Sequence, residues 1–180
     1  MSGRFGARPA RCASDYAPER VAGVKRIPPS IHPKACTAVE IVFVHKQFGR
    51  PSADVLRQLR DAGRDSLPGG GAEIFAARVR KKICDDKCTA DQWLDVHRTA
   101  HQLGLRSNCT MLYGHIESDE DRVDHLLRLR ALQDETGGFQ TFIPLAFHPD
   151  NNALMRLPGP TGVEDLRTYA VSRLVLNNIP

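Results

Sequence analysis

Polar residues able to hold a ligand follow four strand-sized apolar segments of the chain. In parallel α/β folds, ligands bind where the strands end at their carboxyl edge. If the four segments are parallel strands, the residues after them meet on one rim and favour a binding site there. The alternative is that these loops are polar only because solvent surrounds them. The candidates are Glu40; Gly69, Gly70, Gly71 and Glu73; Tyr113, His115 and Glu117; and His148 with Asp150, Asn151 and Asn152.

Three consecutive glycines, Gly69–Gly71, come directly before a predicted helix. Consecutive glycines let a ligand approach backbone N–H groups, and the N-terminus of the following helix favours an anion. A tight turn between strand and helix would need one glycine rather than three. Because the triplet is neither G-x-G-x-x-G nor a P-loop, it indicates an anion-accepting loop without indicating a standard nucleotide fold.

Two cysteines and two histidines offer a competing metal site. Cys84-x₃-Cys88 precedes His97-x₃-His101, and zinc takes such soft and borderline donors. The two histidines are one helical turn apart, but the gap after Cys88 is shorter than the roughly 12 residues of a standard zinc finger. A small zinc-binding or interaction module is therefore an alternative. The simpler interpretation is that the cysteines are incidental and the histidines flank Trp93.

The same cysteine pair is one residue short of an iron–sulfur motif. A C-x₃-C-x₂-C motif would need a cysteine at position 91, where the chain has Asp91. Three thiolates are needed to hold a cluster with one iron left open. We therefore expect neither a cluster nor another metal on this chain. No G-x-S-x-G motif is present either, so serine-hydrolase chemistry is not indicated.

Alternating strands and helices are predicted to position these residues. The predicted strands are Lys34–Val44, Asp65–Leu67, Ser107–Tyr113 and Phe139–Phe147. Helices are predicted to begin near Ser52, Glu73, Thr89, Ser118 and Thr161, with capping boxes at Thr89/Gln92 and Thr161/Glu164. The inward faces of the last two helices are predicted to be Val123, Leu126, Leu127 and Ala131, and then Leu166, Tyr169, Ala170 and Leu174. Regular alternation predicts a parallel sheet with helices outside.

The composition indicates one ordinary globular domain. Of 180 residues, 41% are hydrophobic and 26% are charged, and no apolar run has the roughly 20 residues that a membrane helix needs. The five cysteines are an odd number in a long chain without an apolar leader. We therefore expect reduced thiols, a cytoplasmic location and no membrane association.

The positive charge is concentrated at the start of the chain. Residues 1–30 hold six basic and two acidic side chains, whereas the other 150 residues hold 19 of each. A nucleic-acid binder should carry its basic residues on the folded surface, so we expect no nucleic-acid partner. Glycines and prolines interrupt any periodicity before residue 31. We therefore predict a disordered basic tail over 1–30 and a folded domain over 31–180; Asp15 and Glu19 argue against an organelle transit peptide.

Several long stretches closely resemble the aminofutalosine synthase family, radical S-adenosylmethionine enzymes of menaquinone biosynthesis. The resemblance extends in order from about residue 31 to residue 180. It is carried by Lys34-Ala35-Cys36-Thr37-Ala38-Val39-Glu40-Ile41, by Ser66-Leu67-Pro68-Gly69-Gly70-Gly71-Ala72-Glu73-Ile74-Phe75, by the stretch Trp93–His101, by Thr110-Met111-Leu112-Tyr113-Gly114-His115-Ile116-Glu117 and by the stretch Phe142–Pro149.

The resemblance implies a transferase with S-adenosylmethionine and a 4Fe–4S cluster as cofactors. In such a family the reduced cluster generates a 5′-deoxyadenosyl radical, which adds to the small-molecule substrate 3-[(1-carboxyvinyl)oxy]benzoate, and loss of carbon dioxide gives aminodeoxyfutalosine. The resemblance assigns S-adenosylmethionine contacts to Glu40, Gly69, Gly70, Gly71 and Glu73. It assigns substrate contacts to Tyr113, His115, Glu117 and His148.

This chain departs from the family's pattern in its missing cysteine motif. The family's C-x₃-C-x₂-C motif lies upstream of the matched region, and the sequence contains no such motif. We therefore expect a truncated homologue that is inactive alone; the alternative is a non-catalytic remnant or the zinc or interaction module named above. The implied fold is α/β, a partial (β/α) TIM-type barrel of about four βα units. Its two open edges, Lys34–Val44 and Phe139–Phe147, predict self-association.

Overall fold

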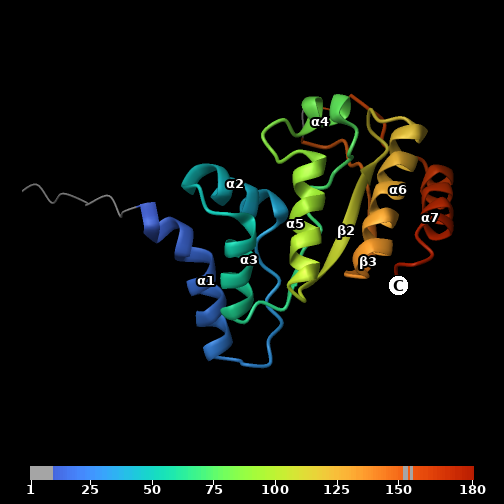
Figure 1. Ribbon diagram of the computed structural model, residues 1–180. Helices are drawn as coiled ribbons and strands as arrows, with labels where there is room; N and C mark the ends of the chain where they lie inside the picture. The colour runs from blue at the N-terminus through green and yellow to red at the C-terminus, as the bar shows by residue number, and fades with distance from the viewer. Residues whose placement is uncertain (1–9, 152–153, 155) are drawn as a thin grey trace, which may run out of the picture.

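Ten helices and strands make up the described part of the chain. The structure is a computed structural model that describes residues 10–151, 154 and 156–180 (Figure 1). The elements are α1 (Ala10–Arg26), α2 (Ala38–Phe48), α3 (Ser52–Asp61), β1 (Ser66–Leu67), α4 (Ala77–Ile83), α5 (Ala90–Gln102), β2 (Arg106–Tyr113), α6 (Asp119–Thr136), β3 (Phe139–Ala146) and α7 (Gly162–Val175).

The three strands form one parallel sheet in the order β1-β2-β3. Partner residues in a parallel ladder point to the same side, so alternate residues of β2 and β3 form two different faces. Ser107, Met111 and Tyr113 of β2 face the helices α5, α6 and α7. Thr110 and its partner Ile143 lie on the opposite face, which in a closed barrel would be the interior.

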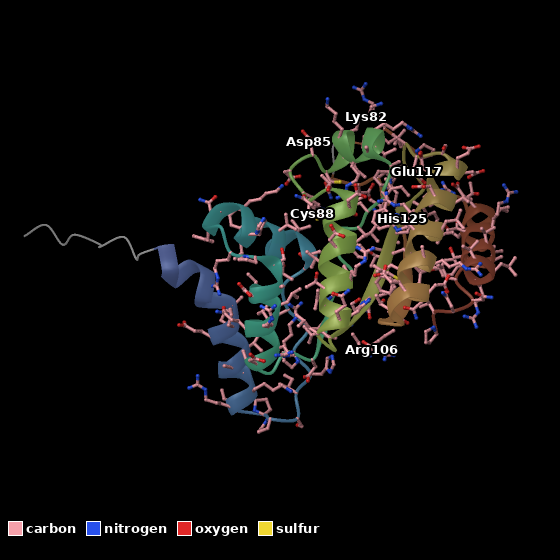
Figure 2. The ribbon with its side chains drawn as sticks, in the orientation of Figure 1. Lys82, Asp85, Cys88, Arg106, Glu117 and His125 are labelled. Carbon is pink, nitrogen blue, oxygen red and sulfur yellow. The ribbon has the colours of Figure 1, made fainter. Side chains whose placement is uncertain are left out.

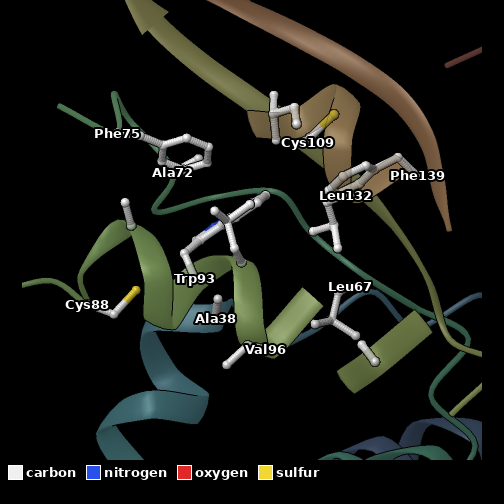
Figure 3. Close-up of a cluster of buried hydrophobic side chains, with 14 of the residues drawn as sticks. Ala38, Leu67, Ala72, Phe75, Cys88, Trp93, Val96, Cys109, Leu132 and Phe139 are labelled. Carbon is white, nitrogen blue, oxygen red and sulfur yellow. The ribbon is translucent and has the colours of Figure 1, made fainter. Parts of the chain in front are cut away.

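A continuous core joins the sheet to the helices around it. Trp93 of α5 is fully buried and lies between the rings of Phe75 and Phe139 (Figure 3). Leu67 of β1 and Leu132 of α6 belong to the same cluster. The fold is therefore α/β with helices packed on one face of an open sheet, and the four predicted βα units reduce to three assigned strands.

Local signals placed several helix ends correctly. Thr89 and Gln92 cap α5 reciprocally, and Ser118 accepts a hydrogen bond from the Asp121 N–H at the start of α6. Gly137 ends α6 with φ +61°, a backbone conformation that glycine adopts without strain. These motifs act over three or four residues, so no knowledge of the fold is needed to recognise them.

The first predicted strand is wrong. Residues 38–48 form helix α2, which begins at a capping box in which the Glu40 carboxylate accepts from the Thr37 N–H at 2.6 Å. The apolar, β-branched composition favoured a strand, but burial follows the helical spacing of Ala38, Ile41 and Val42. The preceding residues, 31–37, pair with no strand of the assigned sheet.

The expectation of a structureless start is also wrong for residues 10–26, which form helix α1. Val21 is 3% exposed, and Lys25 near the helix end pairs with Asp65 at 2.8 Å. Pro18 lies inside the helix, where the sequence reasoning took it as a break. Tertiary packing on the neighbouring helices outweighs the local penalty. Residues 1–9 lie outside the described residues.

The predicted inward faces of the last two helices are largely wrong. On α6 the prediction holds for Leu126 alone. Its other members, Val123, Leu127 and Ala131, are exposed, and Leu129 and Leu132 are buried instead. On α7 the reversal is complete: Thr168 and Ser172 face the protein, and the predicted core residues Leu166, Tyr169, Ala170 and Leu174 face outward. Both helices carry apolar residues on more than one face, so their periodicity alone could not show which face packs against the protein.

Within the described ranges, no helix is both long and apolar enough to cross a membrane.

Candidate functional site

The candidate site lies at the carboxyl ends of the strands, where the loops after β1 and β2 meet. The Leu112 N–H near the end of β2 donates to the Glu73 carbonyl at 2.8 Å, which joins the loop after β1 to the last residues of β2. The start of α2 approaches from the other side, since a Cβ built on Gly70 would lie 3.3 Å from the Thr37 methyl group. The glycine loop, defined here as residues 69–74, is therefore at the centre of this rim.

All six carbonyl oxygens of the glycine loop accept hydrogen bonds from inside the protein. Three donors come from outside α4: Thr110 Oγ1 to Gly69 at 2.8 Å, Trp93 Nε1 to Gly70 at 3.3 Å and Leu112 N to Glu73 at 2.8 Å. The other three carbonyls accept from Arg80 of α4: Ala72 at 2.5 Å, Gly71 at 3.2 Å and Ile74 at 3.2 Å.

This arrangement turns the loop's amide groups outward. In a planar trans peptide the N–H points opposite to the C=O of the same unit, and the described chain has no cis peptide. Carbonyls held inward from Gly69 to Ala72 therefore direct the N–H groups of Gly70 to Glu73 away from the core. Those four N–H groups have no acceptor in the described part of the chain. Successive outward N–H groups form an anion-accepting concavity.

Packing accounts for two of the three glycines. A Cβ on Gly69 would lie 2.8 Å from the Asn108 carbonyl oxygen, and one on Gly71 would lie 2.3 Å from the Val39 side chain. Gly71 also has φ +87°, which disfavours any side chain. The triplet therefore serves close packing against β2 and α2 as well as access to the backbone N–H groups.

Glu73 is held at the edge of the loop. Its φ of +46° is unusual for a residue with a side chain, and it keeps residues 73–76 out of the helix predicted to start there, so α4 begins at Ala77. The carboxylate pairs with Lys87 at 2.6 Å. Burial lowers the pKa of Lys87, but the hydrogen bond and charge of Glu73 outweigh it and raise that pKa overall. Glu40, by contrast, uses its carboxylate to cap α2.

Glu117 stabilises the loop after β2. Its carboxylate accepts from the N–H groups of Gly114 at 2.5 Å and His115 at 2.9 Å, and from Arg122 Nε at 2.7 Å. Burial alone would raise the pKa of Glu117, but hydrogen bonds from His115 and from these backbone groups lower it to about 2. Glu117 is therefore an ionised anchor of the loop before α6 (labelled in Figure 2).

Tyr113 connects the sheet to α7. Its hydroxyl donates to Asp165 at 2.7 Å, and Arg122 lies over its ring while bonding Glu164 at 2.5 Å. Burial, and then the hydrogen bond and charge of Asp165, raise the pKa of Tyr113. The Tyr113 hydroxyl already has a partner in the protein and holds α7 in place.

The two histidines of the predicted substrate side differ in exposure. The His115 side chain is fully buried against Phe147, with Nδ1 2.9 Å from Glu117, and its Nε2 has no described partner. The His148 side chain is 78% exposed beyond the end of β3. The structure thus brings Tyr113, His115 and Glu117 together and leaves His148 on the surface. Asp150 and Asn151 continue this exit, and Asn152 lies outside the described residues.

Comparison with known proteins assigns the family. Residues 34–129, more than half of the chain, match the radical SAM superfamily. The chain belongs to the radical SAM superfamily. It is 54% identical over 169 residues to the aminodeoxyfutalosine synthase of Thermus thermophilus and 47% identical over 175 residues to that of Streptomyces coelicolor, covering 92% of this chain in both cases. It is also 43% identical over 164 residues, 89% of this chain, to the 5-amino-6-(D-ribitylamino)uracil–L-tyrosine 4-hydroxyphenyl transferase of Methanopyrus kandleri.

The chain spans about 45% of the length of these radical SAM relatives. The match to the Thermus enzyme covers 92% of this chain, which is more than the segment 31–180 contains. The similarity therefore continues into the first 30 residues, where our sequence reasoning had ended it. Part of that segment, including residues of α1, is therefore similar to the Thermus enzyme, although it precedes the residues that match the radical SAM superfamily.

The described residues do not fit the 4Fe–4S cluster of a radical SAM enzyme. They contain no group of three His, Cys, Asp or Glu side chains that could hold a metal ion. Cys36, Cys84, Cys88 and Cys109 are free, and burial raises the pKa of each of these four thiols, which opposes the thiolate form that a cluster needs. S-adenosylmethionine does fit, because its carboxylate matches the outward N–H groups of the glycine loop.

The zinc alternative is wrong for the same reason. His97 and His101 do not turn toward Cys84 and Cys88; each bonds the hydroxyl of Ser107, at 2.9 and 2.8 Å. All four candidate ligands are described, and no three of them form a group that could hold a metal ion. The paired histidines are part of the core around Trp93.

Sequence reasoning missed Arg80 and Arg122, the two arginines that hold the rim together. Both lie in helices rich in charged residues, where an arginine usually indicates a solvated face. The one signal for Arg80 was its position next to Val79, a residue of the apolar stripe of α4. Arg122 could not be found, because its partners Glu117 and Glu164 lie on separate elements.

Proposed function

We propose that this chain is the S-adenosylmethionine-binding part of a radical SAM barrel of the aminodeoxyfutalosine synthase type. We propose further that the chain alone binds S-adenosylmethionine without cleaving it. The outward N–H groups of Gly70–Glu73 carry the first proposal. The identity of 54% over 92% of the chain supports the family's substrate, 3-[(1-carboxyvinyl)oxy]benzoate, and menaquinone biosynthesis as the setting of the complete reaction.

Each proposed contact follows from the chemistry of its group. The outward N–H groups would hold a carboxylate, and the carboxylates of Glu40 and Glu73 would accept hydrogen bonds from ribose hydroxyls or the ammonium group. On the substrate side, His115 and His148 would hold the carboxylates of the substrate. Tyr113 and Glu117 would act by positioning the loop that carries His115.

Binding can be measured by titration calorimetry with S-adenosylmethionine. We expect one saturable site per chain, weakened about tenfold in Glu73→Gln because a charge-assisted hydrogen bond is lost. Glu120→Gln is the matched control, since Glu120 lies on the exposed start of α6. If the unmodified chain gives no heat of binding at millimolar ligand, the proposed function is wrong.

The proposed lack of cleavage is tested by measuring whether the chain can hold an iron–sulfur cluster. A bound cluster supplies the electron that breaks S-adenosylmethionine, and the described residues lack a set of ligands for it. After anaerobic treatment with iron and sulfide we expect no stoichiometric iron. Four irons with acid-labile sulfide per chain would contradict this part of the proposal.

We also propose that two copies of the chain associate through α7 and the open edge of β3. Val163, Leu166, Tyr169 and Leu174 are each more than half exposed. A groove of about 160 Å³ lies between this helix and Phe142 of β3. Exposed apolar patches of this kind favour association. Sedimentation equilibrium at micromolar concentration tests this association, and a stable species of 20.0 kDa would refute it.

The free thiols support a reducing, cytoplasmic location.

A further inference from the structure

Arg80 is a buried cation bonded to carbonyl groups instead of carboxylates. It belongs to α4, is 6% exposed and donates to the carbonyls of Gly71, Ala72 and Ile74 in the glycine loop. Its second terminal nitrogen also donates to the carbonyl of Cys88, in the turn before α5. Among the described residues it forms no ion pair, so four peptide dipoles balance its charge.

We propose that Arg80 is the positioning residue that holds the glycine loop in its ligand-accepting form. Holding the carbonyls of Gly71 and Ala72 inward fixes the planes of the two peptide units to which they belong, 71–72 and 72–73. The N–H groups of Ala72 and Glu73 then point outward. Without these bonds both peptide planes can rotate, and the loop's own carbonyls can face the ligand. Arg80 thus acts on binding through the backbone and touches no ligand itself.

The geometry requires a guanidinium. Arg80 reaches four acceptors on two segments, 71–74 and 88, with a planar fork of five N–H donors. A lysine ammonium has three donors around one point and cannot span this set. The pair of Glu73 and Lys87 joins the same two segments at the rim, so Arg80 is the inner of two connections.

The proposal rests on the proposed function only for the identity of the ligand. Its structural part can be tested without ligand by nuclear magnetic resonance of the full chain. Two protons report the loop position: the Trp93 indole N–H, which donates to Gly70, and the Leu112 amide, which donates to Glu73. We expect Arg80→Ala to shift both signals and to accelerate exchange of the Leu112 proton about tenfold or more.

A matched control comes from the same helix. Lys82 of α4 is exposed and points away from the body of the protein (Figure 2). Lys82→Ala removes a positive charge from α4 without touching the loop, so its spectrum should match that of the unmodified chain. Arg80→Lys keeps the charge but loses the fork, and we expect it to behave like Arg80→Ala.

Chemical rescue separates positioning from general stability. Guanidinium ion at low millimolar concentration can occupy the space left in Arg80→Ala. We expect it to return the Trp93 indole and Leu112 signals to their original positions and to restore S-adenosylmethionine affinity, which the variant lowers about tenfold. Sodium chloride at the same concentration should restore neither.

Three outcomes would overturn the proposal. The first is loop signals in Arg80→Ala that match those of the unmodified chain. The second is a shift of the same size throughout the protein, including α3 and α7. The third is failure of both Arg80 variants to fold, which would make Arg80 a residue of general stability. If the unmodified chain does not bind S-adenosylmethionine, the proposed function fails, and the ligand-free spectra still decide the role of Arg80.

Discussion

Ser107 is predicted to be among the most sensitive polar positions of the core. Its hydroxyl lies 2.9 Å from His97 Nδ1 and 2.8 Å from His101 Nε2. The direction of each bond follows from Thr136, whose hydroxyl donates to the Leu132 carbonyl and so must accept from His101 Nδ1. His101 Nε2 is then an acceptor, Ser107 donates to it, and His97 Nδ1 donates to Ser107.

Ser107→Ala removes one oxygen and leaves two ring nitrogens without that partner, one in fully buried His97 and one in partly buried His101. His97 is fully buried and Ser107 is 0% exposed, so water has little access to the vacated position. Each buried polar group left unpaired costs about 1–3 kcal/mol, and the change in volume is small. We therefore expect the free energy of unfolding to fall by about 3 kcal/mol. A loss of that size is a large fraction of the stability of a domain of this size.

Urea unfolding followed by tryptophan fluorescence measures this loss directly. Trp93 is the single tryptophan of the sequence, and its ring lies 3.8 Å from that of His97. Ser52→Ala is the matched control: a helix was predicted to begin near Ser52, and α3 does begin there, but without a side-chain capping bond. We expect Ser52→Ala to change the free energy of unfolding by less than about 0.5 kcal/mol.

A Ser107→Ala variant as stable as the unmodified chain would refute the assigned hydrogen-bond chain. Equal losses in the two variants would refute it as well, because Ser52 has no such partners. A change in the slope with urea would point to an altered unfolded state, so the comparison uses the midpoint at constant slope.

Three further predictions concern pH, a glycine and the α7 surface. Burial lowers the pKa of His125 to about 3, and the pKa of Glu117 is about 2. As the pH falls, these groups therefore bind protons in the unfolded chain before they do in the folded chain. The free energy of unfolding should fall below pH 6.5, and His125 alone should lower it by about 4 kcal/mol at pH 3. Urea titrations that show no change in this free energy between pH 7 and 4 would contradict the prediction. Gly71→Ala should destabilise by about 2 kcal/mol or more, against about 1 kcal/mol for Gly137→Ala, where a Cβ meets nothing within 4 Å; equal thermal midpoints would contradict it. Leu166→Glu should shift sedimentation toward the monomer, and an unchanged dimer would place the interface elsewhere.

Helix ends could be predicted because their signals are local. Thr89 with Gln92, and Ser118 with Asp121, cap helices through atoms three residues apart. The segment 38–44 was misread because β-branched composition outweighed the capping box of Thr37 and Glu40, which is just as local. That box was readable in the sequence, so α2 was recoverable, whereas packing decides which stripe of α7 is buried.

The candidate site could be predicted in position but not in detail. The glycine loop and the residues after β2 were placed on the rim by their order after apolar segments. The bond from Tyr113 to Asp165 joins residues 52 positions apart, and that from Arg122 to Glu164 joins residues 42 apart. Spacing along the chain carries no information on such contacts. The sequence could therefore indicate which residues gather at the rim, but not which are already engaged by partners.

Helix α7 is attached to the rest of the protein mainly by polar contacts. Glu164 and Asp165 anchor its first turn, Thr168 and Ser172 face the protein, and the apolar anchors Leu176 and Ile179 lie just after its last turn. Such an attachment buries little apolar area, so the helix gains little free energy from packing. Helix α7 is therefore expected to open locally, hinged near Leu176, while the sheet and α5 remain closed. Proteases would then find their first cleavage site in this helix under conditions in which the rest of the chain still resists them.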